Sequence, residues 1–186
     1  MRTLLFTMTA SVTLATQLAM AAPTFSVRTR MERPPEMQPI TIADIGYNGE
    51  SFSFVLPQNW RFDPDTASSA LRFHSEDGGK AKISIQFSAE TPPGVFQSAD
   101  ALRQFAAPNL SSAQLLEEFP IYSNNGQGKG ALFGYGFEMR CRAAVVPLGH
   151  GCATFVLTCR TNEMVSEQTL SALITSFRKV AVPAAK

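Results

Sequence analysis

The sequence lacks an excess of charge of either sign, because its 16 lysine and arginine residues are matched by 15 aspartate and glutamate residues. A chain with so little net charge has no overall field to draw it towards nucleic acid or anionic lipid. Beyond about Leu18 it also lacks any long apolar run, and a membrane-spanning helix needs roughly 20 mostly apolar residues. We therefore expect no nucleic-acid partner and no stable membrane anchor.

Histidine is scarce, and this limits the chemistry that the chain can perform. Only His74 and His150 are present, so a zinc site or a Ser-His-Asp centre would have to use one of them. A hydrolase needs a nucleophile, a base and an orienting group brought together, but the sequence has no Gly-x-Ser-x-Gly elbow. Asp63 and Asp65 do not have the spacing of a calcium loop. We predict no catalytic residue, no metal site and no cofactor.

Cysteine is scarce too, and its three residues, Cys141, Cys152 and Cys159, all lie in one C-terminal region. An oxidising compartment would allow two of them to pair. We favour a disulfide between Cys141 and Cys152, which flank the turn of a predicted hairpin, and closing so short a loop stabilises a fold by about 3 kcal/mol. The alternative is Cys141 with Cys159, which strand alternation places on one sheet face. The remaining cysteine is expected to be a buried, unreactive thiol.

The N-terminus has the pattern of a cleavable signal peptide. Arg2 precedes an apolar, threonine-rich stretch from Leu4 to about Leu18, and a small-x-small site ends at Ala21. The threonines dilute the apolar run, which argues against an uncleaved anchor, and no cysteine follows that could carry a lipid. We predict that residues 1–21 are removed and that the mature protein is periplasmic or secreted.

The mature chain has the length of one domain. Residues 22–39 are rich in proline, arginine and glutamate without apolar periodicity, so they are predicted to form a flexible leader. The arginines from Arg28 to Arg33 could dock on an acidic partner, although glutamates are interspersed among them. Residues 40–182 are predicted to form a single α+β domain.

Alternating polar and apolar residues predict a series of strands separated by turns. The Asp77-Gly78-Gly79 sequence indicates a tight hairpin. Gly134 and Gly136 fall within one long predicted strand, where glycine usually marks a bulge or the close approach of another backbone, here that of a packed helix. The strands are expected at residues 51–56, 70–75, 81–87, 119–122, 129–144 and 153–160.

Helices are expected between and after the strands. Ser98 is a suitable N-cap for a helix that ends before Pro108, and a short helical turn is expected over residues 111–117. Residues 163–179 carry apolar side chains at helical spacing. This order predicts an α+β fold in which an antiparallel-dominated β-sheet is flanked by helices.

Four aromatic residues could line a ligand pocket between these elements. Aromatic side chains on alternating strands usually belong to the core, however, so core packing is the favoured interpretation. The four residues are Trp60, Phe62, Phe73 and Phe87.

Three local patterns of packing residues occur together in this chain. They are Phe52-x-Phe-x-Leu56-Pro57-x-x-Trp60, the helix start at Ser98 and the terminal Ile174-x-x-Phe177. With them, about residues 40–180 resemble the PsbP-like family, whose members include extrinsic photosystem proteins and the bacterial DcrB-like envelope proteins. The resemblance implies an α/β/α sandwich that serves as a non-enzymatic binding or assembly module. It carries over no functional residue, because no ligand or catalytic motif of the family is matched.

Two functions of different kinds follow from these observations. The first is a non-enzymatic exported protein that binds another envelope protein or assists its assembly. The alternative is a periplasmic carrier that holds a small molecule or a lipid in a cavity between sheet and helices. A partner captured by crosslinking would support the first function, and a co-purifying ligand would support the second.

Overall fold

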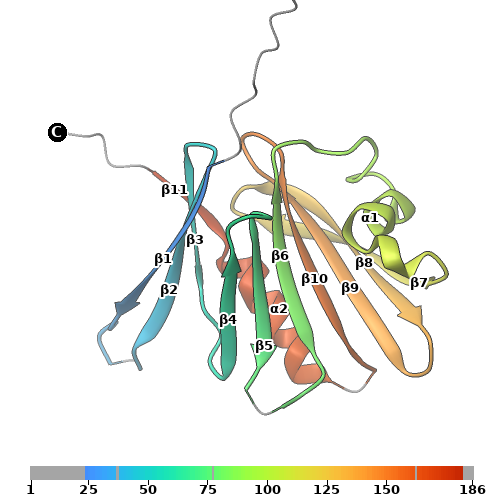
Figure 1. Ribbon diagram of the computed structural model, residues 1–186, viewed down its shortest axis with the longest axis horizontal. Coiled ribbons are helices and arrows are strands. Elements are labelled where there is room, and N and C mark those ends of the chain that lie inside the picture. The colour runs from blue at the N-terminus through green and yellow to red at the C-terminus, as the bar shows by residue number, and fades with distance from the viewer. Residues whose placement is uncertain (1–23, 37, 77, 162, 182–186) are drawn as a thin grey trace, which may run out of the picture.

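The computed structural model describes residues 24–36, 38–76, 78–161 and 163–181 (Figure 1). The predicted signal peptide lies outside these residues. The helices are α1 (Ala99–Ala106) and α2 (Met164–Ser176), with a 3-10 turn, η1, at Pro108–Leu110. The strands are β1 (Phe25–Glu32), β2 (Ile40–Tyr47), β3 (Glu50–Val55), β4 (Trp60–Asp65), β5 (Ala70–Ser75), β6 (Lys82–Ser88), β7 (Gln114–Ser123), β8 (Gly126–Tyr135), β9 (Met139–Pro147), β10 (Cys152–Arg160) and β11 (Arg178–Val180).

The strands form two antiparallel sheets. The smaller one, sheet A, has the order β1-β2-β3-β11, and the larger one, sheet B, has the order β4-β5-β6-β10-β9-β8-β7. In Figure 1, β1 lies at one side of the molecule and β7 at the other. The α+β class with antiparallel strands is confirmed, but the expected single sheet is replaced by two.

Other elements pack against both faces of sheet B through apolar side chains. On one face, Leu102 and Val95 from α1 and its preceding loop pack against Phe133 and Val145 of the sheet. On the other face, α2 and sheet A share one core with β5, β6 and β10. Figure 1 shows the two helices on opposite sides of the large sheet. Phe177 lies fully buried at the meeting point of sheet A, sheet B and the end of α2.

The predicted flexible leader contains a strand, and the expected domain start near Ile40 is therefore too late. β1 pairs along its whole length with β2, from Phe25 opposite Tyr47 to Glu32 opposite Ile40. Phe25 packs against the Tyr47 and Phe87 rings, with ring centroids 6.4 Å and 5.5 Å away. The segment is ordered because the apolar side chains on its inward face join the core.

The long strand predicted over residues 129–144 is a hairpin of two strands, β8 and β9. The chain turns at Gly136 and Glu138, whose φ angles are +57° and +56°. The helical turn expected over residues 111–117 is also wrong, because β7 begins at Gln114. Strand pairing with β8 decides the conformation of this segment rather than its local helical propensity.

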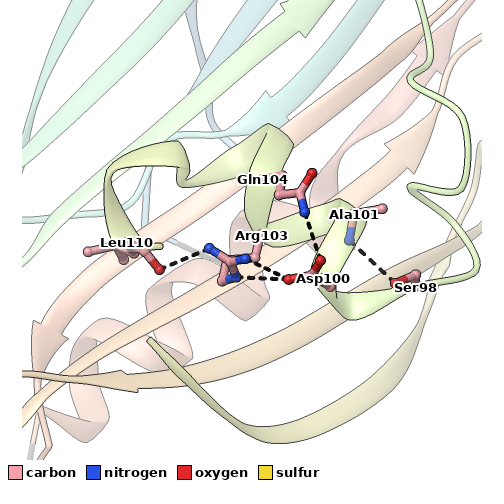
Figure 2. Close-up of polar contacts among 6 residues, drawn as sticks. All are labelled: Ser98, Asp100, Ala101, Arg103, Gln104 and Leu110. Atoms are coloured by element: carbon pink, nitrogen blue, oxygen red, sulfur yellow. Dashed lines mark hydrogen bonds and ion pairs between the residues drawn. The ribbon is translucent and has the colours of Figure 1, made fainter. Parts of the chain in front are cut away.

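α1 begins after Ser98, the N-cap that the sequence predicted. The Ser98 hydroxyl accepts a hydrogen bond from the Ala101 amide at 3.4 Å, as expected of an N-cap (Figure 2). Asp100 in the first turn accepts hydrogen bonds from Arg103 at 2.6 Å, and Arg103 also donates to the Leu110 carbonyl at 3.2 Å. These contacts tie α1 to η1 and fix the entry into β7.

The end of the chain differs from the expected helix over residues 163–179. α2 stops at Ser176, and Arg178 and Lys179 belong to β11, which pairs with β3. Burial of Phe177 between the sheets draws the chain out of the helical path at this point. Among the described residues, no helix has the length and apolar character needed to cross a bilayer.

Candidate protein-binding surface

β7 is an edge strand of ten residues, and within the described part of the chain it pairs with β8 alone. Its other side leaves backbone amides and carbonyls without a strand partner. Pro120 lies in its middle, which suits an edge because proline has no N–H to donate to a further strand. A long exposed edge is a site where another chain can dock, and natural proteins usually block it.

Three large apolar side chains are exposed at the end of the sheet where β7 starts. Leu115 lies opposite Phe133 and faces the α1 side of sheet B, whereas Leu116 lies on the other side. Leu115 and Leu116 are 44% and 49% exposed, and Phe137 in the nearby β8–β9 turn is 86% exposed. Leu116 occupies a bulge in the β7–β8 pairing and lies over Gly134, where an added Cβ would be 3.3 Å from its Cδ1. We call Leu115, Leu116 and Phe137 the apolar corner. A hollow of about 440 Å³ between Leu116 and the β8–β9 turn adjoins it.

The turn holds Phe137 away from the body of the protein. Gly136 and Glu138, on either side of it, both adopt left-handed backbone conformations. The Glu138 carbonyl accepts a hydrogen bond from the Thr161 amide at 2.9 Å, which fastens the tip of the hairpin to the end of β10. Phe137 therefore projects from a turn whose conformation is fixed. Exposed apolar side chains of this size are typical of an interaction site.

A groove runs along the other half of β7, between this strand and α2. Phe119 lies against Gly130 of β8, and the Arg142 guanidinium lies 4.7 Å above the centre of the Phe119 ring. Arg142 is also 3.6 Å from the Glu167 carboxylate, while its Nε is buried without a hydrogen-bond partner among the described residues. The groove encloses about 250 Å³ and is otherwise lined mainly by apolar side chains, including Ile174.

Two of the β8 glycines, Gly130 and Gly134, have side chains of β7 as their close neighbours, whereas Gly128 lies against the backbone of Val145 in β9. The sequence indicated the close approach of a packed helix, but the glycine positions are filled by Phe119 at Gly130 and by Leu116 at Gly134. Gly136 lies in the turn instead of the strand. The glycines therefore shape the β7 side of the sheet.

The predicted disulfide between Cys141 and Cys152 is not formed, and all three cysteines are free. Cys141 and Cys152 share a sheet face, but Cys152 pairs with Pro147 and Cys141 with Thr158, at opposite ends of the hairpin. Six residues of strand place them roughly 20 Å apart, whereas a disulfide needs Cα atoms within about 7 Å. The alternative with Cys159 fails because this residue faces the other side of the sheet, where it joins the α2 core.

Burial suppresses the reactivity of these thiols. Burial, followed by the nearby Cys159, raises the pKa of Cys141 to about 12. Burial and the carboxylates of Glu163 and Glu167 raise the pKa of Cys159 to about 11, and burial also raises the pKa of Cys152. Only a thiolate is an effective nucleophile, so none of the three is suited to nucleophilic catalysis.

We expect a thiol-specific reagent to find three free thiols in protein that is denatured without prior reduction. The native protein should react far more slowly, because the buried thiols must first become accessible and ionise. Colorimetric thiol titration with and without denaturant measures both states. A count of one thiol in the denatured, unreduced protein would show that a disulfide forms after all.

The two histidines lie on different elements of the fold. His74 on β5 is about half exposed and its Nε2 lies 3.9 Å from an Asp63 oxygen, and His150 is exposed in the loop between β9 and β10. No group of three or more potential ligands that could hold a metal ion is found among the described residues. Asp65 instead forms an ion pair with Arg72 at 2.7 Å.

The aromatic residues considered for a ligand pocket form part of the core. Phe73 and Phe87 are fully buried, and Trp60 and Phe62 pack against the same cluster. Trp60 also lines a surface hollow of about 520 Å³ beside the start of α2. The geometry does provide an α+β domain with an open edge strand, an apolar corner and a small groove beside it.

No protein-family model matches the chain, and no curated protein is similar to it. The fold is similar to that of the cyanobacterial PsbP (CyanoP) from a Synechocystis species, with a TM-score of 0.49 and 15% identity over 69% of this chain and 86% of that one. This agrees with the PsbP-like resemblance of the sequence. A similarity at this level concerns the fold and implies no shared partner.

Proposed function

We propose that this protein is a non-enzymatic accessory module of the cell envelope that binds another protein through its apolar corner. The observation that carries the proposal is the 86% exposure of Phe137 on a turn that the hydrogen bond from Thr161 to Glu138 fixes in place. Aromatic residues at the centre of an interface often contribute most of its binding energy. The export signal predicted at the N-terminus supports a partner in the periplasm or outside the cell.

A site-specific photocrosslinker tests this proposal. p-Benzoylphenylalanine replaces Phe137 in the full chain, which is expressed in its native host and irradiated. We expect a discrete crosslinked species containing one partner protein. The separate substitution Phe137→Ser should lower recovery of that partner by about tenfold or more, the typical cost of removing a hot-spot aromatic.

The matched control carries the same crosslinker at Arg61 on β4, whose side chain is 77% exposed and distant from the apolar corner in the sheet order. This position should give no discrete adduct. Adducts of equal yield at both positions, or none at position 137, would contradict the proposal.

The carrier function receives some support from the groove between β7 and α2. Its volume of about 250 Å³ is small, because cofactor and drug-sized ligands usually occupy roughly 300–1,000 Å³. It could accept a small ligand or a single side chain of a partner, but not a lipid chain. Native mass spectrometry of the purified protein distinguishes the two, since a carrier would retain a ligand of defined mass.

A further inference from the structure

The outer face of sheet A carries a charged row that the proposed function does not use. The inner face of the sheet, with Phe52 and Ile45, belongs to the core. On the outer face, one residue from each strand belongs to a row that crosses the whole sheet, because the strand pairing sets these residues opposite one another. The row is Arg28 of β1, Asp44 of β2, Ser53 of β3 and Arg178 of β11. Ser53 in this row is only 1% exposed, so the row presents its charged side chains and not this hydroxyl to an occupant.

The two arginines that end this row are not neutralised within the described residues. Asp44 is bound by Arg30, whose Nε lies 2.8 Å from its carboxylate, and Arg30 also pairs with Glu32. Arg178 donates only a long hydrogen bond, 3.4 Å, to the Ser53 hydroxyl. Neither Arg28 nor Arg178 has a carboxylate partner among the ion pairs of the described chain. The row therefore presents two available guanidinium groups.

The neighbouring row makes a hollow beside the charged row, and Arg28 lines it. It consists of Ser26, Gly46, Ser51 and Val180, which are aligned by the same strand pairings. Their small side chains leave a depression of about 460 Å³ on the sheet surface. Gly46 is needed there, because a Cβ at this position would be 2.6 Å from the Ser26 hydroxyl oxygen. Hydroxyl groups in the hollow can bond to the backbone of an occupant.

We propose that this face of sheet A binds an extended acidic segment of a partner protein, with one carboxylate at Arg28 and another at Arg178. Three strand spacings separate the two backbones by roughly 14 Å. A single small oxyanion is too short for that span, whereas an extended chain covers about 13 Å between residues i and i+4. Arginine binds carboxylates through two parallel hydrogen bonds, which adds geometric preference to the charge attraction.

This site is separate from the apolar corner. β1 and β7 lie at opposite sides of the molecule (Figure 1), so the two surfaces can be tested one at a time. If no partner crosslinks at position 137, the proposal for the sheet A site still stands. If the acidic peptide does not bind, the proposal for the apolar corner still stands.

Amide chemical-shift titration of the full-length mature protein tests the site. The probe is the peptide acetyl-Glu-Ser-Thr-Ser-Glu-amide, in which the two carboxylates are four residues apart. We expect shifts confined to β1, β2, β3 and β11, which weaken as salt is raised because exposed charges are screened. The Arg28→Gln/Arg178→Gln double variant should bind about tenfold more weakly, since two exposed ion pairs are lost.

The controls separate this site from general charge attraction. Arg160→Gln removes an exposed arginine at the end of β10 in the other sheet and should leave the affinity unchanged. A peptide with glutamine in place of both glutamates should not bind. The inference is overturned if the wild-type protein does not bind the probe, if Arg160→Gln weakens binding as much as the double variant, or if inorganic phosphate produces the same shifts at equal concentration.

Discussion

Replacement of Phe177 by alanine is expected to lower the free energy of unfolding by about 3–5 kcal/mol, the usual cost of removing a buried phenylalanine ring. The Phe177 ring stacks on Phe52 of sheet A with centroids 5.4 Å apart and meets Phe155 of sheet B edge-on, also at 5.4 Å. It also lies 6.1 Å from Phe87. One side chain therefore joins both sheets to the end of α2, and a cavity there cannot be filled by a local shift.

Urea denaturation followed by circular dichroism measures this loss, provided that both proteins unfold in a single transition. The control is the same substitution at Phe137, which is 86% exposed. Phe137→Ala should change stability by less than about 0.5 kcal/mol, as surface substitutions usually do. Equal losses at both positions would show that Phe137 is packed in solution and would also contradict its role as an exposed docking residue.

Local signals in the sequence predicted the elements whose partners lie next to them along the chain. The Ser98 cap, the β5–β6 hairpin and the strand after the Gly-His-Gly loop all depend on short-range turns and caps. These features need few residues to define them, because a tight turn fixes the register between the two strands that it joins. The antiparallel α+β class could be inferred for the same reason.

β1 could not be predicted because its order depends on residues distant in the sequence. Only Phe25 and Val27 point to the core, and the other positions are mostly polar or charged. The proline and arginine content of the segment suggested a leader, while pairing with β2 and burial against Phe87 make it a strand. The sequence suggested that Arg28 could meet an acidic partner, but it could not show that Arg28 shares the charged row of sheet A with Arg178 from the other end of the chain.

The apolar corner was missed because its residues were assigned to the wrong elements. Leu115 and Leu116 fell in an expected helical turn, and Phe137 fell on the apolar face of one long strand. Gly136 was the available signal, since a glycine next to a large aromatic residue allows a tight reversal of the chain. The cysteine pairing failed for a different reason, because it depends on the register between β9 and β10. This register sets Cys141 opposite Thr158, which leaves Cys152 at the far end of the hairpin and Cys159 on the other face of the sheet.

Replacement of Gly130 by alanine is expected to destabilise the protein by about 1–3 kcal/mol, the usual range for overpacking. An added Cβ would overlap the Phe119 ring, so the ring must leave the sheet. Its displacement also removes the contact with the Arg142 guanidinium, which lies 4.7 Å from the ring centre. The groove between β7 and α2 would then lose one wall.

Gly134→Ala is the matched control on the same strand and the same face. Its Cβ would be 3.3 Å from Cδ1 of Leu116, a flexible and half-exposed side chain that can rotate away. We expect a change of less than about 0.5 kcal/mol there. A double-mutant cycle then identifies the cause: in a Phe119→Ala background, Gly130→Ala should cost little, because the ring it displaces is absent. An undiminished cost in that background would place the strain in the β8 backbone and would show that glycine at position 130 is not required to make room for the Phe119 ring.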